Sequence, residues 1–149
     1  MENIARLNDV KFGGESEISQ AIVRSRVGYG DGKSIIISDF LTDNNYFDAI
    51  DYLRSKKRDV LCIQVLGEEE LRPSFRGKSI IYDSENANKF YKENITRDVI
   101  KAYQKALKFI HDKIENFCNS READYVQVSA EDSLKDILLG MMTQRGIIE

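Results

Sequence analysis

Short apolar runs alternate along the chain with longer segments in which apolar residues recur every three or four positions. Residues 124–129 form one strand-like segment, and residues 34–38 and 59–66 form mostly apolar runs rich in isoleucine, valine and leucine. Such runs are typical of strands that are buried on both faces of a parallel sheet. A fourth run, 78–83, follows the single proline of the chain, Pro73, and we expect it to form a strand at an edge.

Helical periodicity is present in four segments. The segment 16–27 follows a Gly-Gly turn, 46–55 lies between the first two apolar runs, 95–117 is the longest, and 133–144 closes the sequence. The long segment carries one apolar stripe, made of Val99, Tyr103, Ala106, Leu107, Ile110, Ile114 and Phe117.

The order of these elements predicts the class of fold. Strands that alternate with helices favour a single α/β domain over residues 1–149, with a doubly wound, mostly parallel, Rossmann-like sheet flanked by helices. The polar stretches 68–70 and 84–92 are expected to be connections. In folds of this kind, functional sites lie beyond the carboxyl ends of the strands. Asp39 directly follows the first strand and therefore occupies such a place.

Composition and charge narrow the classes of partner. The 149 residues carry a net charge of -3, and the basic side chains are scattered among acidic ones. We therefore expect no nucleic-acid partner, because such proteins present a sustained positive face. The first residues lack the pattern of a signal peptide, and no apolar run reaches the roughly 18 to 20 residues of a membrane span. These features predict a soluble, cytoplasmic protein.

Most of the other reactive side chains lack the partners that their chemistry requires. Cys62 and Cys118 do not have the close spacing of a metal or redox motif, and we interpret them as buried thiols. His111, the only histidine, has no second histidine or cysteine at ligand spacing, so we interpret it as a helix-surface residue. The stretch 28–34 contains Gly-x-Gly-x-Gly-Lys-Ser, but it leaves a helix and enters a strand, which is the reverse of a phosphate-binding loop.

Asp39 and Ser16 are the candidate metal ligands. Asp39 is either a carboxylate that caps the loop after its strand or a ligand of a hard cation, since Mg²⁺ prefers oxygen donors and needs few protein carboxylates. Ser16 follows Gly13 and Gly14 at the start of a predicted helix, from which its hydroxyl can project. Together the two side chains suggest half of a divalent-metal site.

Six short motifs occur in an order that resembles a known family. They are Gly13-Gly-Glu-Ser16, Ile35-Ile-Ile-Ser-Asp39-Phe40, Val60 to Val65, Glu70-Leu-x-Pro73, Tyr82-Asp83-Ser-Glu85 and Tyr125-Val-Gln-Val-Ser129. This ordered set is similar to that of domain-of-unknown-function family fifty-eight, whose members carry a von Willebrand factor A-like domain. The resemblance extends from about Gly13 to Gly146.

The resemblance implies a metal ion-dependent adhesion site, in which Ser16 stands at the position of the second-loop Thr and Asp39 at that of the third-loop Asp. The first-loop pattern of the family, Asp-x-Ser-x-Ser, does not occur in the sequence. The resemblance therefore implies the C-terminal part of such a domain, without its first strands. With one hydroxyl and one carboxylate left, we expect Mg²⁺ to bind weakly or not at all. In the family order a central strand pairs beside residues 34–38, and its loss leaves an exposed sheet edge through which the chain is expected to form a homo-oligomer.

Two functions follow as expectations. The first is a non-enzymatic protein-interaction domain, whose partner by family analogy is a MoxR-type AAA+ ATPase. The alternative is a small Mg²⁺-dependent phosphotransfer or hydrolase-type α/β domain that uses Asp39 as nucleophile or metal ligand. The acidic groups at 68–70 and at Asp83 and Glu85 lie in polar turns, where solvated carboxylates are common, and we assign no catalytic role to them.

Overall fold

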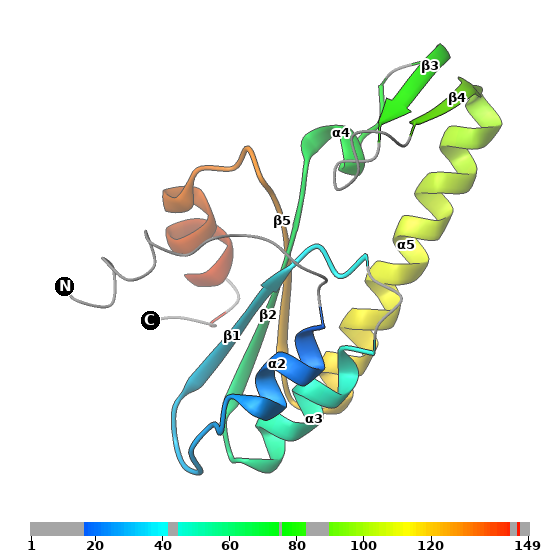
Figure 1. Cartoon of the computed structure of the whole chain (residues 1–149). Coiled ribbons are helices and arrows are strands. Elements are labelled where there is room, and N and C mark those ends of the chain that lie inside the picture. Colours follow the sequence, from blue (N-terminus) through cyan, green and yellow to red (C-terminus); the bar gives the residue numbers. More distant parts are fainter. Residues whose placement is uncertain (1–16, 42–44, 75, 83–89, 144–145, 147–149) are drawn as a thin grey trace, which may run out of the picture.

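A three-stranded parallel sheet lies at the centre of the molecule (Figure 1). It consists of β1 (Lys33–Ser38), β2 (Asp59–Leu66) and β5 (Asp124–Ser129), in the order β1-β2-β5. In the register, Ile36 of β1 pairs with Cys62 of β2, which in turn pairs with Tyr125 of β5. The predicted α/β architecture with a parallel sheet flanked by helices is therefore confirmed. The structure, a computed structural model, describes residues 17–41, 45–74, 76–82, 90–143 and 146.

Three helices pack on one face of this sheet, which we call the helix face. They are α2 (Ile18–Arg24), α3 (Phe47–Ser55) and the long α5 (Arg97–Ser120). A π-helical segment, η1 (Asp136–Met142), packs on the opposite face. In Figure 1, η1 lies on the other side of the sheet from α3 and α5. Helices thus flank both faces, as an α/β fold requires.

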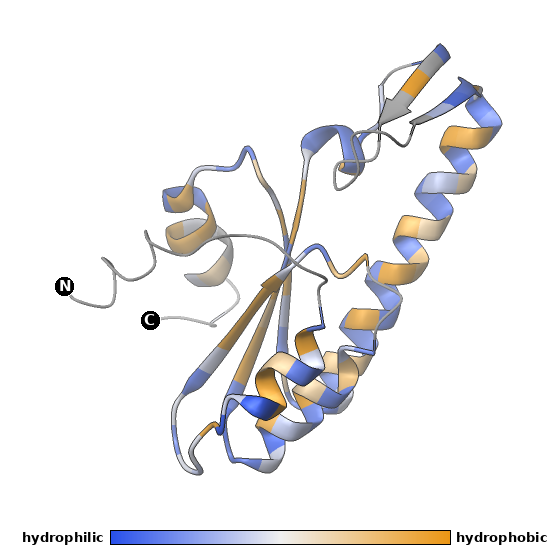
Figure 2. Ribbon diagram, in the orientation of Figure 1, coloured by the Kyte–Doolittle hydropathy of each residue, from blue (hydrophilic) through white to orange (hydrophobic). Residues whose placement is uncertain are grey.

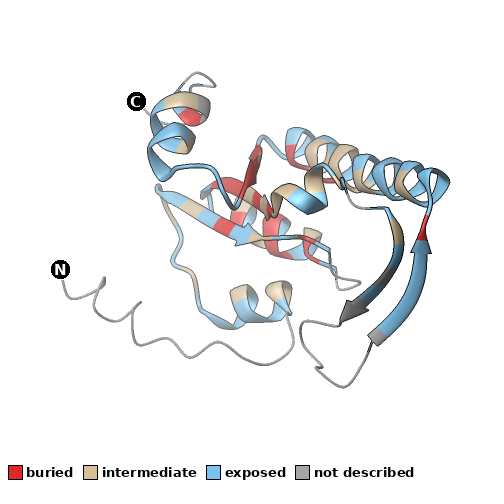
Figure 3. Ribbon diagram, turned by 90° about the horizontal axis from the view of Figure 1, so that it is seen from above, coloured by how far each residue is buried: buried red, intermediate tan, exposed pale blue. Residues whose placement is uncertain are grey.

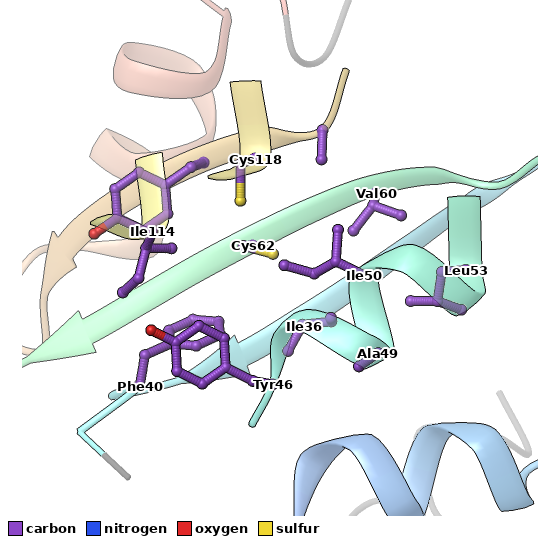
Figure 4. Close-up of a cluster of buried hydrophobic side chains, with 12 residues drawn as sticks. Ile36, Phe40, Tyr46, Ala49, Ile50, Leu53, Val60, Cys62, Ile114 and Cys118 are labelled. Atoms are coloured by element: carbon purple, nitrogen blue, oxygen red, sulfur yellow. The ribbon is translucent and has the colours of Figure 1, made fainter. Parts of the chain in front are cut away.

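The main hydrophobic core lies under the helix face (Figure 4). Ile50 of α3 and Ile114 of α5 are fully buried there, and the Cys62 and Cys118 thiols face each other between β2 and α5. Both cysteines are free and buried, as the sequence predicted. Figure 3 shows that buried residues gather where the helices meet the sheet, whereas much of α5 is exposed.

The opposite face, which we call the open face, is covered unevenly. Near β2 and β5, Met142 of η1 closes over Leu61 and Val126, and all three are buried. On β1, however, Ile35 is 56% exposed and Ile37 is 66% exposed. Figure 2 shows the apolar character of β1 in this region. The expectation that this strand is buried on both faces is therefore wrong for β1, because the described residues cover only its helix face.

A two-stranded antiparallel ribbon precedes α5. It consists of β3 (Gly77–Tyr82) and β4 (Phe90–Ile95). The sequence predicted a turn as far as residue 92 and a helix from Ile95, and this boundary was wrong because the polar residues of β4 become a strand only by pairing with β3. The helix begins after Thr96, whose hydroxyl accepts a hydrogen bond from the Val99 amide at 3.3 Å.

One further helical turn was missed. Residues Glu68–Leu71 form α4, where an exposed connection was expected. The Glu70 carboxylate accepts a hydrogen bond from the Gly67 amide at 2.7 Å and so caps the turn. Glu68 forms an ion pair with Arg72 at 2.6 Å. The acidic run therefore stabilises its own local structure.

Candidate functional site

Asp39 lies at the carboxyl end of β1, as the sequence predicted, and is exposed. Its Oδ1 accepts a hydrogen bond from the Leu41 amide at 3.1 Å. Phe40, between them, has a positive φ of 54°, which is uncommon for a residue other than glycine. These contacts describe a carboxylate that closes a tight turn after its strand. Of the two interpretations of Asp39, capping of the loop is the one with observed contacts.

The backbone of the same residue is anchored in the interior. Gln64 of β2 is fully buried, and its Nε2 donates a hydrogen bond to the carbonyl oxygen of Asp39 at 2.7 Å. Its Oε1 accepts hydrogen bonds from the Tyr125 hydroxyl at 2.6 Å and from Gln127 Nε2 at 2.8 Å. Every polar atom of the Gln64 side chain is thereby satisfied, which removes the cost of burying it. The turn at Asp39 is fixed to the centre of the sheet.

The other half of the expected metal site, Ser16, lies outside the described residues. Asp39 therefore has no partner ligand that can be assigned. Within the part of the chain that is described, the one group of three side chains that could hold a metal ion does not include Asp39. Since one carboxylate that already accepts a hydrogen bond from a backbone amide is a poor Mg²⁺ site, Asp39 alone does not form a site for this ion.

Acidic groups also follow β5, the other outer strand of the sheet. Glu131 Oε2 accepts hydrogen bonds from Ser129 Oγ at 2.6 Å and from the Glu68 amide at 2.9 Å, and the hydrogen bond from Ser129 lowers the pKa of Glu131. Asp132 accepts a hydrogen bond from the Ser129 amide at 3.0 Å. Glu131 thus joins the end of β5 to α4, and Asp132 closes the turn after the strand, so the contacts of both carboxylates are structural. Asp83 and Glu85 lie outside the described residues.

The glycine-rich stretch before β1 also has a structural explanation. The Arg58 guanidinium donates hydrogen bonds to the carbonyl oxygens of Asp31 at 3.3 Å and Lys33 at 3.2 Å. Gly32 has a φ of 144°, and a Cβ there would lie 2.5 Å from Arg58 Nη1. The stretch leads from α2 into β1, so it is not built as a phosphate-binding loop, in agreement with the sequence interpretation.

Sequence reasoning missed the environment of His111. This residue lies on α5, is half-buried rather than fully on the surface, and its Nδ1 lies 3.0 Å from the Tyr125 hydroxyl oxygen. Its Nε2 lies 3.8 Å from Glu115 Oε2, one helical turn away. His111, Asp112 and Glu115 place one ligand atom each within 4.8 Å of one another. The four-residue spacing of His111 and Glu115 on a predicted helix already indicated that the two side chains share one face. The sequence interpretation considered only a second histidine or cysteine as a partner and therefore missed Glu115.

A groove of about 380 Å³ runs between the open face and η1. Ile35 and Ile37 of β1 line one side, and Leu134 and Leu138 line the other. All four of these side chains are exposed. The groove contains few polar groups, so it is suited to an apolar occupant rather than to a charged small molecule.

Comparison with known proteins adds no assignment. The chain matches no model of a protein family, no curated protein and no solved structure. Among the described helices, none is both long enough and apolar enough to cross a membrane.

Proposed function

We propose that this chain is a non-enzymatic, von Willebrand factor A-like protein-interaction domain with an incomplete metal ion-dependent adhesion site. One observation carries the proposal: β1 pairs with one neighbour among the described strands and exposes Ile35 and Ile37 on the open face. Parallel strands are normally covered on both faces, so this surface is suited to contact with another protein segment. The family resemblance would place the central strand of such a domain beside β1.

The partner that the edge of β1 favours is a second copy of the chain. Residues 34–38 contain no proline and no charged side chain, so apart from Lys33 at its first position β1 lacks the features with which edge strands usually prevent association. In a twofold-symmetric dimer, β1 of each copy would pair antiparallel with the other. Ile35 and Ile37 would then lie next to the same residues of the partner, which would cover them in part and join the two open faces into one continuous apolar surface.

Sedimentation velocity over a range of concentrations tests this proposal. The wild-type chain is expected to shift toward a dimer as concentration rises, whereas Ile37→Lys is expected to stay monomeric because it places a charge on the open face. The matched control is Ile80→Lys, since Ile80 is also exposed but belongs to the β3–β4 ribbon. The proposal fails if the wild-type chain stays monomeric, or if both variants weaken association equally.

The family resemblance adds a MoxR-type AAA+ ATPase as a second partner. The same pair of variants is informative: a purified ATPase of this type is expected to co-sediment with the wild-type chain and with Ile80→Lys, but not with Ile37→Lys. Failure of this test alone leaves the domain proposal in place and removes the ATPase from it.

The enzymatic alternative assigns Asp39 as nucleophile or Mg²⁺ ligand. The hydrogen bond from the Leu41 amide to Asp39 favours a structural role instead. We expect no Mg²⁺-dependent release of phosphate from a simple phosphoester, and weak or undetectable Mg²⁺ binding by calorimetry. Turnover that requires Mg²⁺ and disappears in Asp39→Ala would overturn the non-enzymatic assignment.

A further inference from the structure

The hydrogen bonds around His111 on α5 determine which of its ring nitrogens carries the hydrogen. Gln64 Nε2 donates to the Asp39 carbonyl oxygen, so Gln64 Oε1 is the acceptor for the Tyr125 hydroxyl proton. Because that hydroxyl has a single proton, its oxygen can only accept from His111, and Nδ1 of the imidazole must carry a hydrogen. The neutral ring then has its lone pair on Nε2. This is the arrangement of many metal-binding histidines, in which the second nitrogen donates to a neighbouring group.

Two carboxylates lie beside this nitrogen. Glu115 Oε2 is 3.8 Å from His111 Nε2, and Asp112 completes a group whose ligand atoms all lie within 4.8 Å of one another. Two ligands bound to one ion at about 2.0 to 2.2 Å lie roughly 3 to 3.5 Å apart, so a small rotation of these half-buried side chains suffices to bring them together. Asp112 at present forms an ion pair with Lys108 at 2.8 Å.

We propose that His111 Nε2, Glu115 and Asp112 form a binding site for a divalent transition-metal ion of the zinc class. An imidazole ligand favours Zn²⁺ and its neighbours over Mg²⁺ and Ca²⁺, which prefer oxygen donors alone. Three protein ligands leave the remaining positions of the ion to water or to a group of a partner. This site is separate from the Asp39 region and does not depend on the function proposed above.

Tyr125 is a positioning residue for the site. Its hydroxyl holds the imidazole in the tautomer that leaves Nε2 unprotonated, and Gln64 orients the hydroxyl in turn. Partners of this kind typically change metal affinity by about 10- to 100-fold. Tyr125→Phe is therefore expected to bind Zn²⁺ about tenfold more weakly although it removes no ligand.

Titration of the full chain with Zn²⁺, followed by nitrogen NMR of the imidazole, tests the proposal directly. Because the sequence has a single histidine, both ring signals belong to His111. We expect Zn²⁺ to shift the Nε2 signal, whereas the Nδ1 hydrogen is retained. Calorimetry is expected to give one ion per chain. Binding that leaves Nε2 unchanged would overturn the assignment.

Variants separate this site from general attraction of cations. Glu115→Gln is expected to weaken Zn²⁺ binding at least tenfold, and the control Asp98→Asn, which removes the same charge from the first turn of α5, is expected to have little effect. Lys108→Ala should strengthen binding because it frees Asp112, whereas Lys105→Ala removes an equal charge without contacting the site. Equal effects within either pair would overturn the proposal.

The two cysteines need a control of their own. A Co²⁺ complex of the native chain is expected to lack the intense near-ultraviolet band of thiolate ligation, since Cys62 and Cys118 are buried in the core. Appearance of that band would show that the ion binds to thiols of a partly unfolded chain, and would contradict the proposed site.

Discussion

The helix face and the open face of the same three strands differ in what covers them. On the helix face, α3 and α5 pack over β1, β2 and β5, and Ile50 and Ile114 are fully buried. On the open face, η1 covers β2 and β5 through Met142 but leaves β1 exposed. A strand with equally apolar residues on both sides can therefore be half core and half surface. Stability should depend mainly on the first face and association on the second.

The faces also differ in polarity. The helix face contains the hydrogen-bonded chain from the Asp39 carbonyl through Gln64 and Tyr125 to His111. The groove of the open face is lined mainly by aliphatic side chains. A satisfied polar network specifies one arrangement of its neighbours, whereas an aliphatic surface can accept different partners. Four substitutions test this contrast.

Ile50→Ala is expected to have the largest effect. It removes methyl groups from a fully buried position under α3, and substitutions of this type cost about 2–5 kcal/mol because a cavity remains. Chemical denaturation followed by circular dichroism would measure the change in the free energy of unfolding. A loss below about 1 kcal/mol would mean that α3 does not form part of a close-packed core.

Gln64→Leu should have the next largest effect on the free energy of unfolding. The substitution removes the donor to the part-buried Asp39 carbonyl and the acceptor of the Tyr125 hydroxyl proton, and a buried polar group that loses its partner costs about 1–3 kcal/mol. Gln127→Leu is the control, because Gln127 is only half-buried and donates one hydrogen bond to the same oxygen. Equal stability of the two variants would contradict the central role of Gln64.

Alkaline pH is expected to lower the free energy of unfolding, because Tyr125 on the helix face loses its phenol proton. Burial, and then the nearby Glu115 charge, raise the pKa of Tyr125 in the folded state, whereas a tyrosine in the unfolded chain has a pKa of about 10. The folded state then holds the phenol proton more tightly, so this contribution to stability is complete below pH about 10 and is lost as the pH rises further. Tyr125→Phe should lose stability less steeply above that pH. Burial also raises the pKa of Tyr46, so some alkaline loss should persist.

Ile37→Ser should change stability least. The residue is mostly exposed on the open face, and substitutions at such positions usually alter the free energy of unfolding by less than about 0.5 kcal/mol. The same denaturation assay applies, at a concentration low enough to avoid association. A loss comparable with that of Ile50→Ala would mean that the open face is covered in the monomer, and the contrast between the faces would disappear.

The sequence by itself determined most of the elements and their order along the chain. The apolar runs of β1, β2 and β5 and the stripe of α5 were readable because strand and helix periods differ. The carboxylate at the end of β1 and the burial of both cysteines were also predictable. The strand β4 was not, since residues such as Lys92 and Glu93 have no apolar alternation and adopt a strand only through pairing with β3.

Only the tertiary structure decided which side chains meet. A run of three isoleucines indicates that a strand is apolar. It does not indicate that Ile36 enters the core whereas Ile35 and Ile37 remain exposed. That difference depends on what packs against each face of the strand. Likewise, His111 and Tyr125 are 14 positions apart on different elements, and their contact arises from the way α5 crosses β5. Periodicity is a local property of the chain, whereas coverage and hydrogen-bond partners depend on contacts between distant segments.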